Sequence, residues 1–182
     1  SEPYKLCTFS RVMKEKGIED AINAVESVNA HFGRTVYTLD IFGQVDVEYK
    51  ERFSQLEKSF PDYISYGGAI EANKSVETLK SYFALLFPTY YKGEGFAGTL
   101  IDAMSAGVPV IASDWKYNPE FVVPGKTGVI IKNCNAERLA EELINIAAAP
   151  EKWNSMRLSA LKESEKYKPD IAARPLIDRI NG

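Results

Sequence analysis

Short apolar segments alternate with amphipathic segments along the whole chain. Residues 17–31 repeat apolar side chains at the i, i+3, i+4 spacing that places them on one face of a helix. Residues 83–87 and 108–112 are instead short apolar runs, the first followed by Pro88 and the second preceded by Gly107. Such runs are typical of strands buried on both faces. The alternation therefore predicts an α/β domain in which helices cover both faces of a parallel sheet.

The same pattern sets the expected order of the elements. Strands are expected at residues 4–9, 36–42, 64–66, 83–87, 108–112 and 128–131. Helices are expected at residues 17–31, 48–60, 75–82 and 136–147, after Gly98, and from residue 150 to the end with an interruption near Pro169. No repeat, low-complexity tract or linker divides the chain. The sequence thus predicts a single three-layer α/β domain over residues 1–182, with about six parallel strands.

Composition narrows the class of protein without identifying it. The chain has 182 residues, a hydrophobic content of 45% and a net charge of −3, which are ordinary values for one globular domain. Nothing global indicates binding to nucleic acid or to an anionic membrane surface. Cys7 and Cys134 are too few for a disulfide framework, and no apolar run approaches the roughly 18 residues of a membrane span. We therefore expect a cytoplasmic protein.

A glycine-rich stretch before the fifth predicted strand is open to two interpretations. Gly93, Gly95 and Gly98 match the dinucleotide-binding pattern G-x-G-x-x-G, and Asp114 stands where an acid would bind a ribose. In that pattern, however, the first strand of the fold runs almost directly into the first glycine. Here residues 88–92 intervene, and the preceding strand is about the fourth. A dinucleotide-binding oxidoreductase is therefore the weaker interpretation.

The helix that follows this stretch has its own chemistry. Small residues at Gly95 and Gly98 would let an anion approach the main-chain N–H groups of the helix start, where the helix dipole favours negative charge. Gly98 can equally serve only a tight loop, with Thr99 as the helix cap. Asp102 fits a capping box with Thr99. Glu94 lies in a loop between glycines, and is either a functional acid or a solvated one.

Residues 88–122, PTYYKGEGFAGTLIDAMSAGVPVIASDWKYNPEFV, resemble the donor-binding half of the group 1 retaining glycosyltransferases. That family has an acid, seven residues and a second acid, followed by a helix of small residues and the strand Gly-x-Pro-Val-Ile-Ala. The two acids fall on Glu94 and Asp102. The family usually has Glu at the second position, so this chain departs from it by one methylene group.

A second match lies after the first predicted strand. Residues 10–17, SRVMKEKG, are similar to the family loop in which an Arg and a Lys five residues later bind the diphosphate of the donor. Those roles fall on Arg11 and Lys16. The resemblance therefore implies Glu94, Arg11 and Lys16 as catalytic residues. It implies that the donor-binding residues are Gly95, Phe96, Ala97, Gly98, Thr99 and Asp102.

The resemblance also implies the architecture and the chemistry. The expected fold is a Rossmann-like domain that forms one half of a GT-B enzyme. The expected reaction is transfer of a sugar from a UDP- or GDP-sugar to a glycan or lipid-linked acceptor, as in polysaccharide biosynthesis. No Asp-x-Asp occurs in the chain, which fits a metal-independent site with no cofactor other than the sugar nucleotide itself. Trp115, Lys116, Tyr117 and Glu120 receive no role.

The family has a second, N-terminal domain that forms the acceptor side of the cleft. Residue 1 is Ser rather than Met and the first strand begins at Tyr4, so we expect this chain to be a domain excised from a longer protein. Residues 169–182 would form a terminal helix that packs toward that N-terminal domain. Membrane association, if any, would be peripheral and would occur through the same missing domain. The isolated chain is expected to bind the donor without catalysing transfer.

Three other functions remain open at this point. A GT-B epimerase shares the architecture, although it lacks the spacing of acids seen here. A dinucleotide-binding oxidoreductase would use the glycine pattern. A catalytically impaired scaffold would keep the fold, and the replacement of the usual Glu by Asp102 is the only sequence feature in its favour.

Overall fold

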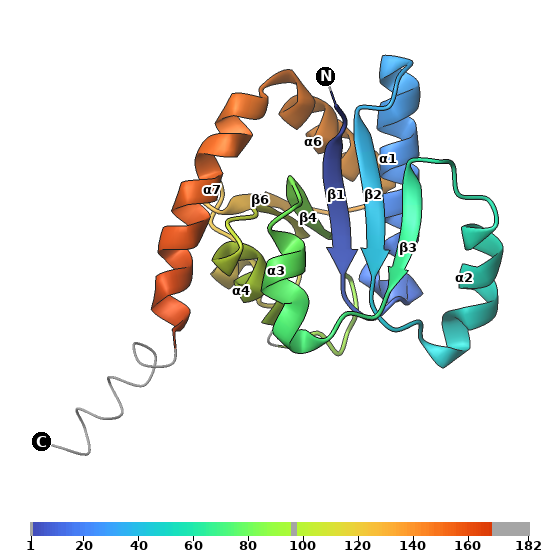
Figure 1. Ribbon diagram of the computed structural model, residues 1–182, viewed down its shortest axis with the longest axis horizontal. Coiled ribbons are helices and arrows are strands. Elements are labelled where there is room, and N and C mark those ends of the chain that lie inside the picture. Colours follow the sequence, from blue (N-terminus) through green and yellow to red (C-terminus); the bar gives the residue numbers. More distant parts are fainter. Residues whose placement is uncertain (1, 96–97, 169–182) are drawn as a thin grey trace, which may run out of the picture.

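A computed structural model describes residues 2–95 and 98–168, and its strands form one sheet. All strand pairs are parallel, and the order across the sheet is β3-β2-β1-β4-β5-β6 (Figure 1). The strands are β1 (Tyr4–Phe9), β2 (Tyr37–Phe42), β3 (Ile64–Gly68), β4 (Ala84–Phe87), β5 (Val110–Ser113) and β6 (Gly128–Ile131). The predicted six-stranded parallel sheet is confirmed.

Helices connect successive strands and complete the three layers. They are α1 (Ile18–Phe32), α2 (Lys50–Glu57), α3 (Ser75–Leu79), α4 (Gly98–Ser105), α5 (Asn118–Phe121), α6 (Ala136–Ala148) and α7 (Pro150–Ser164). Short 3₁₀ turns are η1 (Lys14–Lys16), η2 (Val47–Tyr49), η3 (Ala72–Lys74) and η4 (Glu165–Tyr167). Within the described ranges no helix is long and apolar enough to cross a membrane.

Two hydrophobic cores lie on the two faces of the sheet. Successive strand residues point to opposite faces, so Leu6 of β1 packs with α1 and α6, whereas Cys7 packs with α3 and α4. Strand β4 alternates in the same way, with Leu86 in the first core and Leu85 in the second. Because β4 serves both cores, it is apolar throughout, which is the pattern that the sequence shows.

The strand order places a topological switch point between β1 and β4. The chain leaves β1 through α1 toward β2 on one side, and leaves β4 through α4 toward β5 on the other. At such a switch point the two connections diverge, which opens a crevice beyond the carboxyl ends of the two strands. The loops after β1 and β4, which carry the predicted site residues, both emerge there (Figure 1).

The observed boundaries differ from the predicted ones by small amounts with local causes. Strand β3 continues to Gly68 because pairing with β2 resumes after a register shift next to Phe42. The helix predicted at 48–60 is split into η2 and α2, and it ends at Glu57. Beyond that point the N–H groups of Ser59 and Phe60 bond three residues back, so the chain tightens into a turn. The helix predicted for residues 169–182 lies outside the described residues.

Asn29 fastens α1 to the start of β2. Its side chain is buried, and Nδ2 donates to the carbonyl of Tyr37 at 2.9 Å. Its Oδ1 accepts from the N–H groups of Val36 and Tyr37 at 2.8 and 3.0 Å. One side-chain amide therefore satisfies the hydrogen-bonding capacity of three main-chain groups at the buried start of β2.

We predict that Asn29→Ala lowers the free energy of unfolding by about 3 kcal/mol, the upper end of the cost of one unsatisfied buried polar group. Urea denaturation of the 182-residue chain measures it. Asn23→Ala is the matched control, because Asn23 is exposed on the same helix, and it should change stability by no more than about 0.5 kcal/mol. Equal losses in the two variants would contradict the fastening role of Asn29.

Candidate functional site

The structure joins two of the predicted catalytic residues directly. Lys16 ends η1 after β1, and Glu94 lies in the loop after β4. The Nζ atom of Lys16 is 2.7 Å from both carboxylate oxygens of Glu94. The two side chains are only 12% and 8% exposed, so this ion pair is largely buried. It bridges the two loops at the switch point, 78 residues apart in sequence.

Aromatic rings line the remaining surroundings of the Lys16 ammonium. Its nitrogen is 5.7 Å from the ring centre of Phe87 and 5.2 Å from that of Tyr91. A cation at this distance from an aromatic face is stabilised by the negative charge on the ring surface. The ammonium group is thus largely removed from water, and its electrostatic contacts are stronger than those of a surface lysine.

The two loops can approach closely because residue 17 is glycine. Gly17 has φ 72° and ends the 3₁₀ turn that carries Lys16. A Cβ atom at this position would lie 2.4 Å from the carbonyl oxygen of Pro88. The N–H group of Tyr90 donates to the carbonyl of Glu15 at 2.8 Å and holds the loops together. Only glycine permits both the backbone conformation and the contact.

Arg11 lies apart from the buried pair. Its side chain is 61% exposed, and the guanidinium pairs with Asp46, the residue before η2, at 3.6 Å between Nη1 and Oδ2. Val12 and Val45 pair as a parallel bridge and bring the loops after β1 and β2 together. A small surface hollow of about 190 Å³ lies between these loops, lined by Arg11, Gln44, Val45, Asp46 and Val47. Arg11 is therefore on the rim of the crevice, with its cation open to solvent.

The start of α4 is open in the way that anion binding requires. Gly95 and Gly98 are exposed, and a Cβ atom at either position would meet nothing within 4 Å. The helix begins at Gly98, so Thr99 lies inside the first turn and is not the cap. Phe96 and Ala97, two of the predicted donor-binding residues, lie outside the described residues.

Asp102 has a partner that the sequence did not indicate. Its Oδ2 atom accepts a 2.5 Å hydrogen bond from the hydroxyl of Ser75, the first residue of α3. Ser75 is buried, so the contact ties α4 to α3. The capping-box interpretation of Thr99 and Asp102 is therefore wrong, because the carboxylate faces a neighbouring helix rather than the start of its own.

Four polar residues that sequence reasoning missed support the loop that carries Glu94. Thr89 donates to Glu94 Oε2 at 2.6 Å, and Ser113 donates to the carbonyl of Thr89 at 2.5 Å. Asn118 donates to the carbonyl of Ser113 at 3.1 Å, and the indole of Trp115 donates to the carbonyl of Tyr91 at 2.8 Å. Their position in the sequence could have indicated two of them, because Thr89 and Ser113 are polar residues at the carboxyl ends of apolar strands.

The outer side of the crevice is acidic. The guanidinium of Arg52 and the hydroxyl of Tyr49 donate to the carboxylate of Glu19, and the Arg52 hydrogen bond lowers the pKa of Glu19. Burial raises the pKa of Asp20, and neighbouring Glu19 adds to that rise. Burial likewise raises the pKa of the Tyr90 hydroxyl, with Asp20 and other acids adding to the rise.

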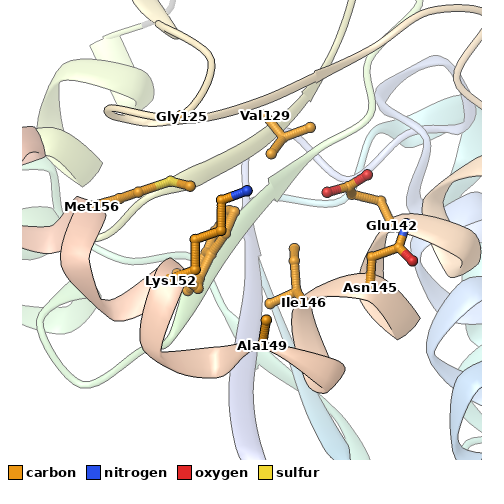
Figure 2. Close-up of a pocket in the computed structure, with 9 residues that line it drawn as sticks. Gly125, Val129, Glu142, Asn145, Ile146, Ala149, Lys152 and Met156 are labelled. Atoms are coloured by element: carbon orange, nitrogen blue, oxygen red, sulfur yellow. The ribbon is translucent and has the colours of Figure 1, made fainter.

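A separate hollow of about 240 Å³ lies at the opposite edge of the sheet (Figure 2). It is formed by residues before and within β6, by α6 and by the start of α7. Lys152 and Glu142 point into it from two helices, above the side chain of Ile146. It contains none of the predicted site residues and lies at the amino ends of the strands, so the candidate site is the crevice at the carboxyl edge.

Comparison with known proteins identifies the family. The sequence model described as "Glycosyl transferases group 1" matches residues 1–163. The chain belongs to the group 1 glycosyltransferases. The GtfA subunit of the UDP-N-acetylglucosamine–peptide N-acetylglucosaminyltransferase of Streptococcus gordonii is 33% identical over 131 residues, which cover 71% of this chain and 24% of that protein. The chain thus spans about a quarter of the length of this curated relative.

Solved structures agree on the fold of this glycosyltransferase domain. The pneumococcal O-GlcNAc transferase GtfA, solved with UDP and GlcNAc, has a TM-score of 0.80 at 23% identity, over 98% of this chain and 35% of that one. The C-terminal domain of the group 1 protein LpcC from Francisella tularensis has a TM-score of 0.76 at 20% identity, over 91% of this chain and 87% of that one. The predicted Rossmann-like domain of GT-B type is confirmed.

Replacing Gly17 tests the close contact between the loops after β1 and β4, and replacing Gly33 is the matched control. Both have left-handed backbones at the two ends of α1, with φ of 72° and 63°. Gly33→Ala meets no neighbour and should cost only the left-handed strain of about 1–2 kcal/mol. Gly17→Ala should lower the free energy of unfolding further, because the new methyl group collides with Pro88. Chemical denaturation of both variants compares the losses, and equal losses would contradict the contact.

Proposed function

We propose that this domain binds the nucleotide-sugar donor of a retaining, metal-independent glycosyltransferase, at the crevice between the loops after β1 and β4. The buried pair of Lys16 and Glu94 carries the proposal, because it places a cation and an acid together at the switch point of the sheet. The donor is a UDP- or GDP-sugar. The relationship to proteins that use or were solved with UDP-linked compounds supports this class of ligand.

The proposed chemistry follows from where charge develops. When the bond between the anomeric carbon and the diphosphate oxygen breaks, negative charge builds on the departing diphosphate. Lys16 and Arg11 supply positive charge to it from the loop after β1, and the N–H groups at the start of α4 add the helix dipole. In this mechanism Glu94 accepts hydrogen bonds from hydroxyl groups of the donor sugar and fixes its orientation.

Donor binding requires the Lys16–Glu94 pair to change its partners. Lys16 now gives its hydrogen bonds to both oxygens of Glu94. A bound diphosphate would accept some of the hydrogen bonds of the ammonium group. The sugar hydroxyls would then donate to the carboxylate in place of the ammonium group. The contacts to the donor would form in a site that is already largely removed from water, which strengthens them.

Asp102 is proposed to accept from the ribose hydroxyls of the nucleotide. Among the described residues no donor reaches its Oδ1 atom, whereas Oδ2 is held by Ser75. The contact of Oδ2 with Ser75 fixes the direction of the carboxylate, and Oδ1 would accept from the ribose. The acceptor, a glycan or a lipid-linked sugar, would bind to a second domain of the same polypeptide, and transfer would require both domains.

Isothermal titration of the 182-residue chain with UDP and GDP tests the proposal. One of the two should bind, and Arg11→Ala and Lys16→Ala should each weaken that binding roughly 10- to 150-fold, as expected for loss of a charge-assisted contact of about 1.5–3 kcal/mol. Circular dichroism confirms that each variant is folded. Lys16→Arg is included because it keeps the positive charge opposite Glu94.

Arg138→Ala is the matched control for Arg11→Ala. Both arginines are 61% exposed and pair with an acid, but Arg138 lies on α6 and pairs with Glu141 of the same helix rather than with a residue of the loops after β1 and β2. Its replacement should leave the dissociation constants unchanged. Absence of UDP and GDP binding to the folded parent at millimolar concentration would refute the proposed function. Unchanged affinity in both the Arg11 and the Lys16 variants would refute the diphosphate assignment alone.

A further inference from the structure

Buried polar residues are concentrated at the loop that carries Glu94. Among residues 2–95 and 98–168, the buried polar side chains are Thr8, Asn29, Ser75, Thr89, Ser113, Asn118, Thr127 and Ser164. Three of them, Thr89, Ser113 and Asn118, form one connected series of hydrogen bonds. Burying polar groups costs free energy unless they are satisfied, and a fully satisfied series holds its members in one arrangement.

The series runs from α5 to the carboxylate. Asn118, at the start of α5, donates to both oxygens of Ser113 at the end of β5, at 3.1 and 3.4 Å. Ser113 donates from its hydroxyl to the carbonyl of Thr89 at 2.5 Å. Thr89 then donates to Glu94 Oε2 at 2.6 Å. The contact between Ser113 and Thr89 joins the loops after the paired strands β5 and β4, whereas the other contacts lie within one of these loops.

The Thr89 hydroxyl has one proton, and its best acceptor is the carboxylate. The carbonyl of Glu15 lies at 3.4 Å, which is long for a hydrogen bond from a hydroxyl group, whereas Glu94 lies at 2.6 Å. The hydroxyl oxygen of Thr89 also accepts a hydrogen bond from the N–H group of Tyr91 at 3.2 Å. Thr89 therefore links both sides of the loop, because it accepts a hydrogen bond from the main chain and donates one to the acid.

The loop has a second brace at its tip. The carbonyl of Tyr91 accepts from the N–H group of Glu94 at 3.0 Å, which makes a turn of residues 91–94. It also accepts from the indole of Trp115 at 2.8 Å. Lys16 binds both oxygens of Glu94, so its hydrogen bonds alone leave the plane of the carboxylate free to follow a moving ammonium group. Among residues 2–95 and 98–168, Thr89 is the one other side chain that donates to this carboxylate.

We propose that Thr89 is a positioning residue, which holds the Glu94 carboxylate in place for the donor sugar when Lys16 shifts toward the diphosphate. This inference rests on the proposed function. Thr89 acts through Glu94 and makes no contact with the diphosphate. Loss of its hydroxyl should therefore reduce the affinity for the sugar part of the donor and leave the affinity for the nucleoside diphosphate alone.

The experiment measures two dissociation constants for each variant of the 182-residue chain. The probes are UDP or GDP, and the tightest binder among UDP-glucose, UDP-N-acetylglucosamine, GDP-glucose and GDP-mannose. The ratio, which is the dissociation constant of the nucleoside diphosphate divided by that of the sugar nucleotide, reports the contribution of the sugar to binding. Thr89→Val keeps the shape and removes the hydroxyl. We expect its affinity for the diphosphate to stay within about twofold of the parent, while the ratio falls at least fivefold toward unity. Thr89→Ser restores the hydroxyl and should restore the ratio.

Two other threonines provide matched controls. Thr8 on β1 is as buried as Thr89, but its hydroxyl has no hydrogen-bond partner in the part of the chain that the structure describes, so Thr8→Val should leave both dissociation constants unchanged. Thr127 accepts the N–H group of Val123 at 2.8 Å outside the crevice. Thr127→Val should lower stability without changing the ratio, which separates loss of a buried hydrogen bond from loss of carboxylate positioning.

A double variant tests whether Thr89 acts through Glu94. In a Glu94→Gln background, Thr89→Val should change the ratio no further. A parental ratio in Thr89→Val, an equal loss in Thr89→Ser, or an additional loss in the Glu94→Gln background would each overturn the positioning role while leaving the proposed function intact. A folded parent that binds no nucleoside diphosphate would overturn the proposed function itself, and the inference with it.

Discussion

The buried ion pair of Lys16 and Glu94 is the interaction on which the rest of the site depends. Removing two charges from water costs several kcal/mol per ion, and this is offset only when the geometry is good and the remaining hydrogen-bonding capacity is used. The geometry is good here, because the ammonium contacts both carboxylate oxygens, and the carboxylate also accepts a hydrogen bond from the hydroxyl of Thr89. The pair fixes the distance between the loops after β1 and β4, and thereby the width of the crevice.

The fold explains why the charges meet at this place. In the strand order β3-β2-β1-β4-β5-β6 the neighbours β1 and β4 send their chains in opposite directions, so two loops face each other without a helix between them. Gly17 allows the main chains to approach, and the buried hydroxyl of Ser113 joins the next loop to the same edge. The site is therefore built mainly from loops, but each loop is held by a strand end or by another loop.

Much of the fold could be predicted because its signals are local. The apolar runs of the six strands and the helical spacing of residues 17–31 are visible in short windows, and the observed strands differ from the predicted ones by no more than two residues at either end. Roles for Arg11, Lys16, Glu94 and Asp102 came from a resemblance, and the structure leaves those roles as proposals. The partners of these residues could not be predicted, since a hydrogen bond such as that of Ser75 to Asp102 depends on how two helices pack.

The sequence by itself determined the succession of strands and helices along the chain and the apolar cores on both faces of the sheet. It also determined which charged residues follow the strand ends. The tertiary structure alone decided which charges meet. It placed Lys16 against Glu94, left Arg11 on the rim with Asp46, and turned Asp102 toward Ser75. The physical reason is that element formation follows from the periodicity of neighbouring residues, whereas side-chain pairing follows from strand order and loop contacts between residues far apart in the chain.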